Sequence, residues 1–152
     1  MAFDHVCVVG LGYVGLPTAA MIASRGVQVT GVDVNPRTVE TINEGRPHIT
    51  EPDLDMVLQG AVSKKFMSAR TTPVAADAFI LAVPTPFTKD LKPDLSYLEA
   101  ATKAVAPVLK PGDLVVVEST VPVGATQQVG ATGNLVLQPG GANGAAGTAS
   151  VN

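Results

Sequence analysis

The stretch Val6–Gly15, which reads VCVVGLGYVG, decides the fold of this chain. Its apolar start predicts a short buried strand, and Gly10, Gly12 and Gly15 follow in a GxGxxG turn. An alanine-rich run over 16–23 then predicts a helix. In such a unit the first glycine permits a tight turn, the second lets the backbone approach a pyrophosphate, and the third lets the helix lie against the strand. The stretch therefore predicts a dinucleotide site, with phosphates facing the N–H groups at the start of the helix.

An acidic residue at the end of the next apolar stretch supports this prediction. A second strand is expected over 27–32, and it ends in Asp33, about 20 residues beyond the glycines, where a carboxylate can hold both hydroxyls of an adenosine ribose. Asp33 could instead cap the helix that begins near Pro36. Its charge would repel a 2′-phosphate, so NAD is favoured over NADP. Arg37 could stack on the adenine or lie in solvent, and a cation there leaves NADP open.

Strands and helices alternate along most of the chain. Further strands are expected over 66–71, 78–83 and 114–117, and a helix over 95–109 that Pro107 kinks or ends early. The continuous apolar run 78–83 is typical of a central parallel strand. The alternation predicts the α/β class, with a Rossmann-type, doubly wound parallel sheet.

Several polar residues fall in loops where a ligand could bind. Thr85 follows the run 78–83 in a proline-rich loop, where it could contact the cofactor or bond its own backbone. His48 is a lone loop histidine, a kind of residue that usually has no chemical role. Asp53 and Asp55 do not predict a metal site, because residues two apart on a helix do not face each other.

Composition limits the classes of partner. The chain has 152 residues, 46% hydrophobic and 15% charged, which suffices for one domain with a sizeable core. Its net charge is −3, with no basic run beyond Lys64-Lys65, so nucleic acid is not expected as a partner. No apolar run approaches the roughly 20 residues that cross a bilayer, and no secretion signal opens the chain. The single cysteine, Cys7, excludes an internal disulfide and fits the cytoplasm.

The last part of the chain differs in composition from the rest. From Ser119 to Asn152 there is no Asp, Glu, Lys or Arg, and Gly, Ala, Thr and Asn dominate after residue 129. We therefore expect a domain over 1–128 and a flexible, low-complexity tail over 129–152, in which 135–137 is at most a stray strand. A sheet that lacks its last strands would leave one edge uncovered and favour association.

Five separated segments resemble the NAD-binding domain of the UDP-sugar 6-dehydrogenases, in particular the UDP-N-acetyl-D-mannosamine branch, which serves bacterial surface polysaccharide. The alternatives are a UDP-glucose 6-dehydrogenase, another NAD-dependent dehydrogenase such as the β-hydroxyacid group, and a non-catalytic nucleotide-binding module. The matching segments are 10–17, 31–35, 49–55, 83–87 and 118–126.

The resemblance implies specific contacts with NAD. The amides of Tyr13 and Val14 would face the pyrophosphate, and Asp33 would hold the ribose. Thr85 and Thr126 would contact the cofactor from the ends of the fourth and fifth strands. Thr120 would lie near the nicotinamide, where its hydroxyl could order a water.

The resemblance also implies an incomplete reaction centre. The family oxidises an alcohol to a carboxylate in two NAD-dependent steps through a thioester on a cysteine, using groups from its central and carboxyl-terminal portions. Cys7 cannot substitute, because a thiol buried in the first strand has a raised pKa and a low nucleophilicity. We therefore expect no catalytic residue in this chain and NAD binding without turnover. The full-length protein would act on a UDP-sugar as a homo-oligomer.

Overall fold

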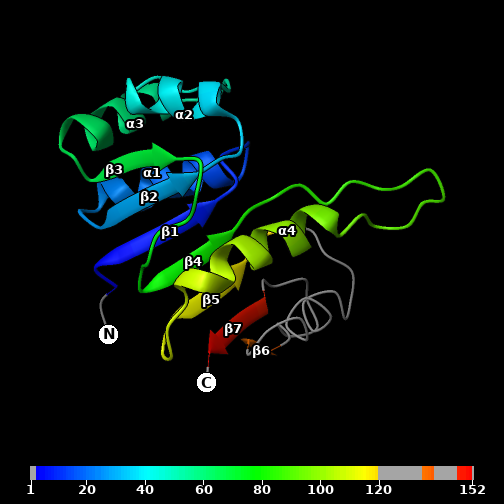
Figure 1. Cartoon of the computed structure of the whole chain (residues 1–152). Coiled ribbons are helices and arrows are strands. Elements are labelled where there is room, and N and C mark those ends of the chain that lie inside the picture. The colour runs from blue at the N-terminus through cyan, green and yellow to red at the C-terminus, as the bar shows by residue number, and fades with distance from the viewer. Residues whose placement is uncertain (1–2, 120–134, 139–146, 152) are drawn as a thin grey trace.

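Five parallel strands form the centre of the molecule (Figure 1). The computed structural model describes residues 3–119, 135–138 and 147–151. The strand order β3-β2-β1-β4-β5, with β1 in the middle, confirms the Rossmann-type parallel sheet. The strands are β1 (His5–Val9), β2 (Gln28–Val32), β3 (Met67–Arg70), β4 (Ala78–Leu81) and β5 (Leu114–Val117).

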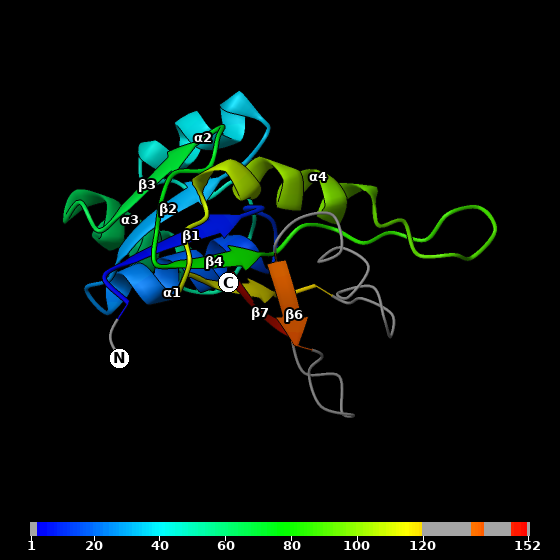
Figure 2. The same cartoon turned by 60° about the horizontal axis from the view of Figure 1, so that its bottom comes forward.

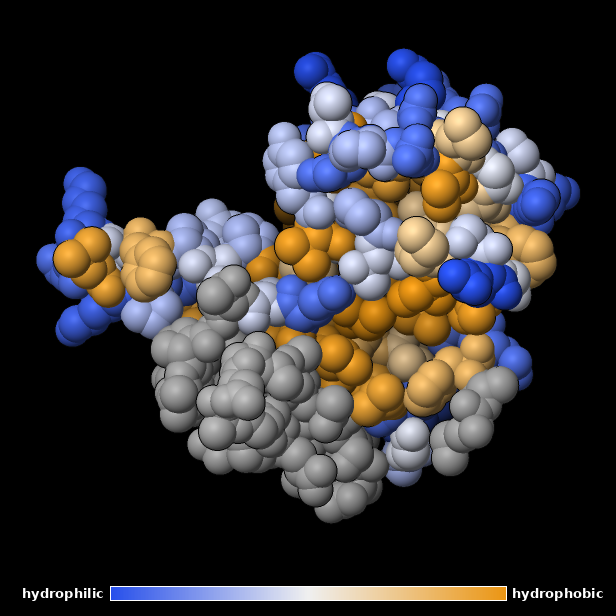
Figure 3. Space-filling view, turned by 180° about the vertical axis from the view of Figure 1, so that it is seen from behind, coloured by the Kyte–Doolittle hydropathy of each residue, from blue (hydrophilic) through white to orange (hydrophobic). Residues whose placement is uncertain are grey.

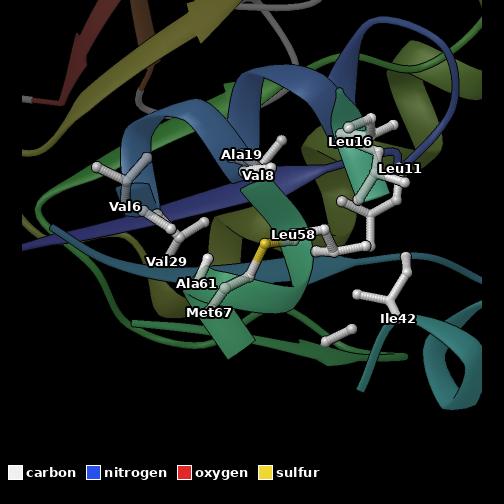
Figure 4. Packing of buried hydrophobic residues seen from close by; sticks show 14 of the residues in the cluster. Val6, Val8, Leu11, Leu16, Ala19, Val29, Ile42, Leu58, Ala61 and Met67 are labelled. Atoms are coloured by element: carbon white, nitrogen blue, oxygen red, sulfur yellow. The ribbon is translucent and has the colours of Figure 1, made fainter. Parts of the chain in front are cut away.

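Helices cover both faces of this sheet, as Figures 1 and 2 show. One face packs on three helices, and its core joins alternate residues of β1, such as Val6 and Val8, to Leu16 and Leu58 (Figure 4). The other face packs on a single helix and a short 3₁₀ turn that contains Pro107. The helices are α1 (Gly15–Ser24), α2 (Pro36–Asn43) and α3 (Leu54–Ser63) on the first face, and α4 (Ser96–Val105) with η1 (Ala106–Val108) on the second.

The chain changes face between β1 and β4, and this change creates a crevice. After β1 it continues into α1 on one face, whereas after β4 it continues into α4 on the other. The two connections diverge above neighbouring parallel strands, so the carboxyl ends of β1 and β4 border an open space. Ligands of doubly wound sheets bind at such a point.

The connection from β4 to α4 is an arm that extends away from the body (Figure 1). Its two sides are joined by backbone bonds from Thr88 to Lys92 and from Asp94 to Pro86, each 2.7 Å long. Phe87 is 73% exposed on this arm, which also appears as a projection in the space-filling view of Figure 3. The arm begins beside Thr85, so it continues directly from the wall of the crevice.

Two short strands from the end of the chain extend the sheet. They are β6 (Leu135–Gln138) and β7 (Gly147–Val151), and β7 pairs antiparallel with β5. The edge of β5 is therefore paired, whereas the sequence led us to expect an uncovered edge. Antiparallel pairing needs only extended backbone with free N–H and C=O groups, which a run of small residues can supply without any apolar pattern. The domain boundary at residue 128 stays a prediction.

Candidate cofactor site

A cleft of about 1010 Å³ lies at the carboxyl ends of the central strands. The glycine turn 10–14 forms its middle, and Asp33 at the end of β2 marks one end. Thr85, after β4, and Glu118, after β5, mark the other end, and α4 forms a side wall that includes Ala100. The cleft is therefore elongated across the sheet, as an extended dinucleotide requires.

The surroundings of Gly10 and Gly15 explain the tight turn and the close packing of the helix, and the pyrophosphate contact at Gly12 stays a prediction. Gly10 has φ +94°, and a Cβ there would lie 2.6 Å from the carbonyl oxygen of Ala82. A Cβ on Gly15 would lie 1.7 Å from the carbonyl oxygen of Gly10, so the helix can approach the strand only without a side chain. A Cβ on Gly12 would meet nothing within 4 Å. Because Gly12 lines the cleft, this open space is available to a ligand.

The turn is held from beneath by one apolar side chain that the sequence analysis did not single out. Leu11 is completely buried, and a Cβ on Gly31 of β2 would lie 2.8 Å from one of its methyl carbons. The backbone of the turn is tied to the same strand, because the Gly10 amide donates to the Val32 carbonyl at 2.8 Å. The position of the turn is thus fixed by packing and by a hydrogen bond.

The residues that lead into α1 line the cleft. The first internal bonds run from Leu16 N–H to Gly12 O at 3.1 Å and from Thr18 N–H to Val14 O at 3.2 Å. Tyr13 and Val14 precede the helix and line the cleft with exposed side chains. N–H groups at the start of a helix have no intrahelical partner and bind anions well.

Asp33 points toward the glycine turn. Its Oδ2 accepts a hydrogen bond from the Leu11 amide at 3.2 Å, and its Oδ1 accepts one from the Asn35 amide at 2.9 Å. The cap of α2 is Asn35, whose side chain accepts from the Arg37 amide at 3.0 Å. The interpretation of Asp33 as the helix cap is therefore wrong. Its carboxylate lies at the edge of the cleft, where a ribose hydroxyl can reach it.

The other predicted contacts differ in how the structure places them. Thr85 lines the cleft beyond β4. Arg37 is exposed in the first turn of α2 and is not part of the cleft lining. Thr120 and Thr126 lie outside the described residues. The cofactor contacts of all four side chains stay predictions.

The described residues offer little for covalent or metal chemistry. Cys7 is fully buried in β1, and burial raises the pKa of its thiol against a smaller opposing effect of the Val74 backbone. His48 is exposed and does not line the cleft. In residues 3–119 and the two terminal strands, no cluster of His, Cys, Asp and Glu could hold a metal ion. None of the described helices is long and apolar enough to span a membrane.

One polar residue of the cleft was missed by the sequence analysis. Glu118 lies directly after β5, and its Oε1 accepts a hydrogen bond from the Thr18 hydroxyl at 3.3 Å. Only its place at the end of a parallel strand could have indicated a role. Beside it, the Ser119 hydroxyl donates to the Val83 carbonyl at 2.7 Å and joins the segments that follow β4 and β5.

Comparison with known proteins decides the family. Residues 4–136 match the family described as the UDP-glucose/GDP-mannose dehydrogenase family, NAD binding domain. The chain belongs to this family. This domain binds NAD, and the residues of the cleft fit that cofactor: Gly12 leaves space beside the helix start, and Asp33 points at the turn.

Relatives with assigned activities are similar over most of this chain. It is 61% identical over 127 residues to an NDP-N-acetyl-D-galactosaminuronic acid dehydrogenase of Ralstonia nicotianae, and 59% identical over 129 residues to a UDP-N-acetyl-D-mannosamine dehydrogenase of Yersinia pestis. These alignments cover 84% and 85% of the chain but only 30% and 31% of the relatives. The chain thus spans about three tenths of the length of these proteins.

Solved structures agree with this assignment. The structure of UDP-D-ManNAc dehydrogenase from Pyrococcus horikoshii superposes with a TM-score of 0.81 at 40% identity, over 84% of this chain and 31% of that one. A UDP-glucose dehydrogenase from Pyrobaculum islandicum gives a TM-score of 0.79 at 42% identity, over 84% of this chain and 31% of that chain. The fold expected from the sequence is therefore the fold of these dehydrogenases.

Proposed function

We propose that this chain is the cofactor-binding part of a UDP-N-acetyl-D-mannosamine 6-dehydrogenase, which oxidises the C6 alcohol of the sugar to a carboxylate. The family membership carries this proposal, and the resemblance of several separated motifs supports it. NAD supplies the acceptor for hydride when bound. The residues of this chain hold the pyrophosphate at the Tyr13 and Val14 amides and the adenosine ribose at Asp33.

A second sugar is a specific alternative. The relatives with 61% and 60% identity are named NDP-N-acetyl-D-galactosaminuronic acid dehydrogenases. Both groups of relatives are named for N-acetylated amino sugars, and relatives named for either one match this chain almost equally well. We therefore place the substrate among nucleotide-linked N-acetylhexosamines, with the manno epimer first and UDP-glucose as a further alternative.

This chain alone is proposed to bind NAD without turnover. The expected thioester needs a reactive cysteine, and the single cysteine of the sequence is Cys7, which is buried in β1. The whole protein is proposed to work in the cytoplasm as a homo-oligomer, where its nucleotide-sugar substrate is available.

Two measurements test the proposal. Calorimetry with the 152-residue chain should give micromolar binding of NAD⁺ and much weaker binding of NADP⁺, because Asp33 disfavours a 2′-phosphate. The same chain, given NAD⁺ and UDP-N-acetyl-D-mannosamine, should form no NADH. NADH formation would overturn the proposed inactivity, and preference for NADP⁺ would overturn the role given to Asp33.

A chimera tests whether this chain can serve as the cofactor-binding part of such a dehydrogenase. Residues 4–128 would replace the matching part of the UDP-N-acetyl-D-mannosamine dehydrogenase of Escherichia coli, which is 56% identical over 129 residues. The chimera should reduce NAD⁺ with UDP-N-acetyl-D-mannosamine. A folded chimera that binds NAD⁺ but oxidises no nucleotide sugar would contradict the proposal.

A further inference from the structure

Glu118 is a carboxylate at the end of the cleft opposite Asp33. Its amide donates to the Leu81 carbonyl at 2.9 Å, so its backbone continues the pairing of β5 with β4. Val115 and Val117 belong to the core on the α4 face of the sheet. Because side chains alternate between the two faces along a strand, the side chain of Glu118 lies on the other face, toward α1. There its Oε1 accepts the hydrogen bond from Thr18. The side chain is therefore held at a defined position.

The second carboxylate oxygen lacks a partner. Oε2 of Glu118 is buried, and within the described part of the chain it accepts no hydrogen bond. A buried polar atom without a partner is unfavourable, and a charged one more so. None of the described residues that line the cleft is a Lys, Arg or His, so no cation of the cleft wall offsets this charge. The site therefore has one free acceptor and one uncompensated negative charge.

The path of the cofactor brings a suitable group to this oxygen. With the ribose at Asp33 and the pyrophosphate at the start of α1, the other half of NAD must extend over the ends of β4 and β5. This half ends in a nicotinamide, whose carboxamide carries N–H donors. The ring is a cation in NAD⁺ and neutral in NADH. NAD⁺ would thus bring a hydrogen-bond donor and a positive charge, the two partners that the Glu118 carboxylate does not find among the described residues of the cleft.

We infer that Glu118 is a positioning residue for the nicotinamide, which accepts a hydrogen bond from the carboxamide at Oε2 and favours NAD⁺ over NADH by its charge. This inference rests on the NAD site described above. Thr18 holds the carboxylate in place from α1. A dehydrogenase that must bind NAD⁺ and release NADH twice in one reaction sequence gains from this preference.

The test compares three ligands on the 152-residue chain by calorimetry: NAD⁺, NADH and ADP-ribose, which lacks the nicotinamide. The E118Q variant keeps an acceptor but loses the charge. It should weaken NAD⁺ binding about fivefold, the order expected for one partly screened charge contact, and leave NADH and ADP-ribose unchanged. The E118A variant also loses the acceptor, so it should weaken both NAD⁺ and NADH but not ADP-ribose.

Matched variants separate this role from a structural one. D33N, at the other end of the cleft, should weaken all three ligands. The T18V variant loses the hydrogen bond to Glu118 but keeps the Glu118 charge, so it should retain most of the preference for NAD⁺ over NADH. If Glu118 only supports the fold, E118Q and T18V will lower the melting temperature alike and leave the ratio of NAD⁺ to NADH affinity unchanged, which would overturn the inference.

The unmodified chain provides a test that needs no variant. It should bind NAD⁺ more tightly than ADP-ribose, because the nicotinamide adds a favourable contact. Equal affinity for the two would overturn the role of Glu118 while the cofactor assignment stands. A folded chain that binds neither ligand would overturn the cofactor assignment and this inference together.

Discussion

Gly12 and Gly15 lie three residues apart in the same turn, but their surroundings are opposite. A Cβ on Gly15 would collide with backbone, whereas one on Gly12 would enter the open cleft. G15A should therefore lower the free energy of unfolding by about 3 kcal/mol or more, because backbone atoms must move to admit it. G12A should change the free energy of unfolding by less than about 1 kcal/mol and yet weaken NAD⁺ binding at least about tenfold, since its methyl group would fill the space proposed for the phosphates.

Chemical denaturation and calorimetry on both variants check this prediction. G12A serves as the control for G15A, because each adds one methyl group to the turn. A stable G15A protein, or a G12A protein with normal NAD⁺ affinity, would contradict the roles assigned to these glycines.

Cys7 gives the folded protein a defined sensitivity to alkaline pH. Burial raises the pKa of its thiol, so the folded chain holds this proton more tightly than the unfolded chain. The resulting stability is fully present below the unfolded pKa of about 8.5 and is lost as the pH rises through the folded pKa. The free energy of unfolding should therefore fall faster between about pH 8 and pH 10 in the parent than in C7A. Parallel pH curves for the two proteins would show that Cys7 makes no such contribution.

At the level of single residues, the sequence predicted those that obey a backbone rule. Gly10 and Gly15 are required by the backbone of the turn, and Gly12 and Asp33 follow from the spacing of the fingerprint. Leu11 follows no such rule, and a place at the end of a strand is too general to single out Glu118. Their importance comes from packing on Gly31 and from a buried oxygen without a partner, which depend on segments that are distant in the sequence.

At the level of elements, Asn43 joins the end of α2 to the edge strand β3. Its Nδ2 donates to the Ala69 carbonyl at 3.0 Å, and its Oδ1 accepts from the Ala69 amide at 2.7 Å. N43A would leave both backbone groups of Ala69 unpaired, so we expect a loss of about 1–2 kcal/mol in the free energy of unfolding. E40A, on the exposed side of the same helix, should change it by no more than about 0.5 kcal/mol.

Urea titrations of N43A, E40A and the parent protein measure these differences. Equal stability of N43A and E40A would indicate that β3 does not depend on this side-chain bridge. NAD⁺ affinity should be normal in both variants, because neither residue lines the cleft.

At the scale of the whole molecule, the end of the chain protects the sheet. β7 pairs with β5, so the hydrogen-bonding groups on that edge are satisfied within the chain. Removal of residues 135–152 should expose the edge of β5 and produce larger species in size-exclusion chromatography with light scattering, because open strand edges pair with other chains. A shortened chain with the same mass distribution as the parent would contradict this expectation.

The parallel sheet and its flanking helices could be predicted because β1, β4 and β5 are apolar runs, β3 alternates between buried and exposed residues, and α4 has apolar residues at helical spacing. The runs expected over 27–32, 66–71, 78–83 and 114–117 contain β2, β3, β4 and β5. The antiparallel addition of β7 to the sheet could not be predicted, because β7 consists mainly of small residues and pairs with β5 through its backbone. Composition alone led to the expectation of an uncovered edge.

The seating of Leu11 on Gly31 has a consequence for the thermodynamics of cofactor capture. A glycine turn that is anchored by a buried side chain has already lost conformational freedom before any ligand arrives. The dinucleotide then binds to a turn that is already ordered, so none of its binding free energy is spent on ordering a flexible segment. The turn is therefore a preorganised binding site and does not depend on induced fit.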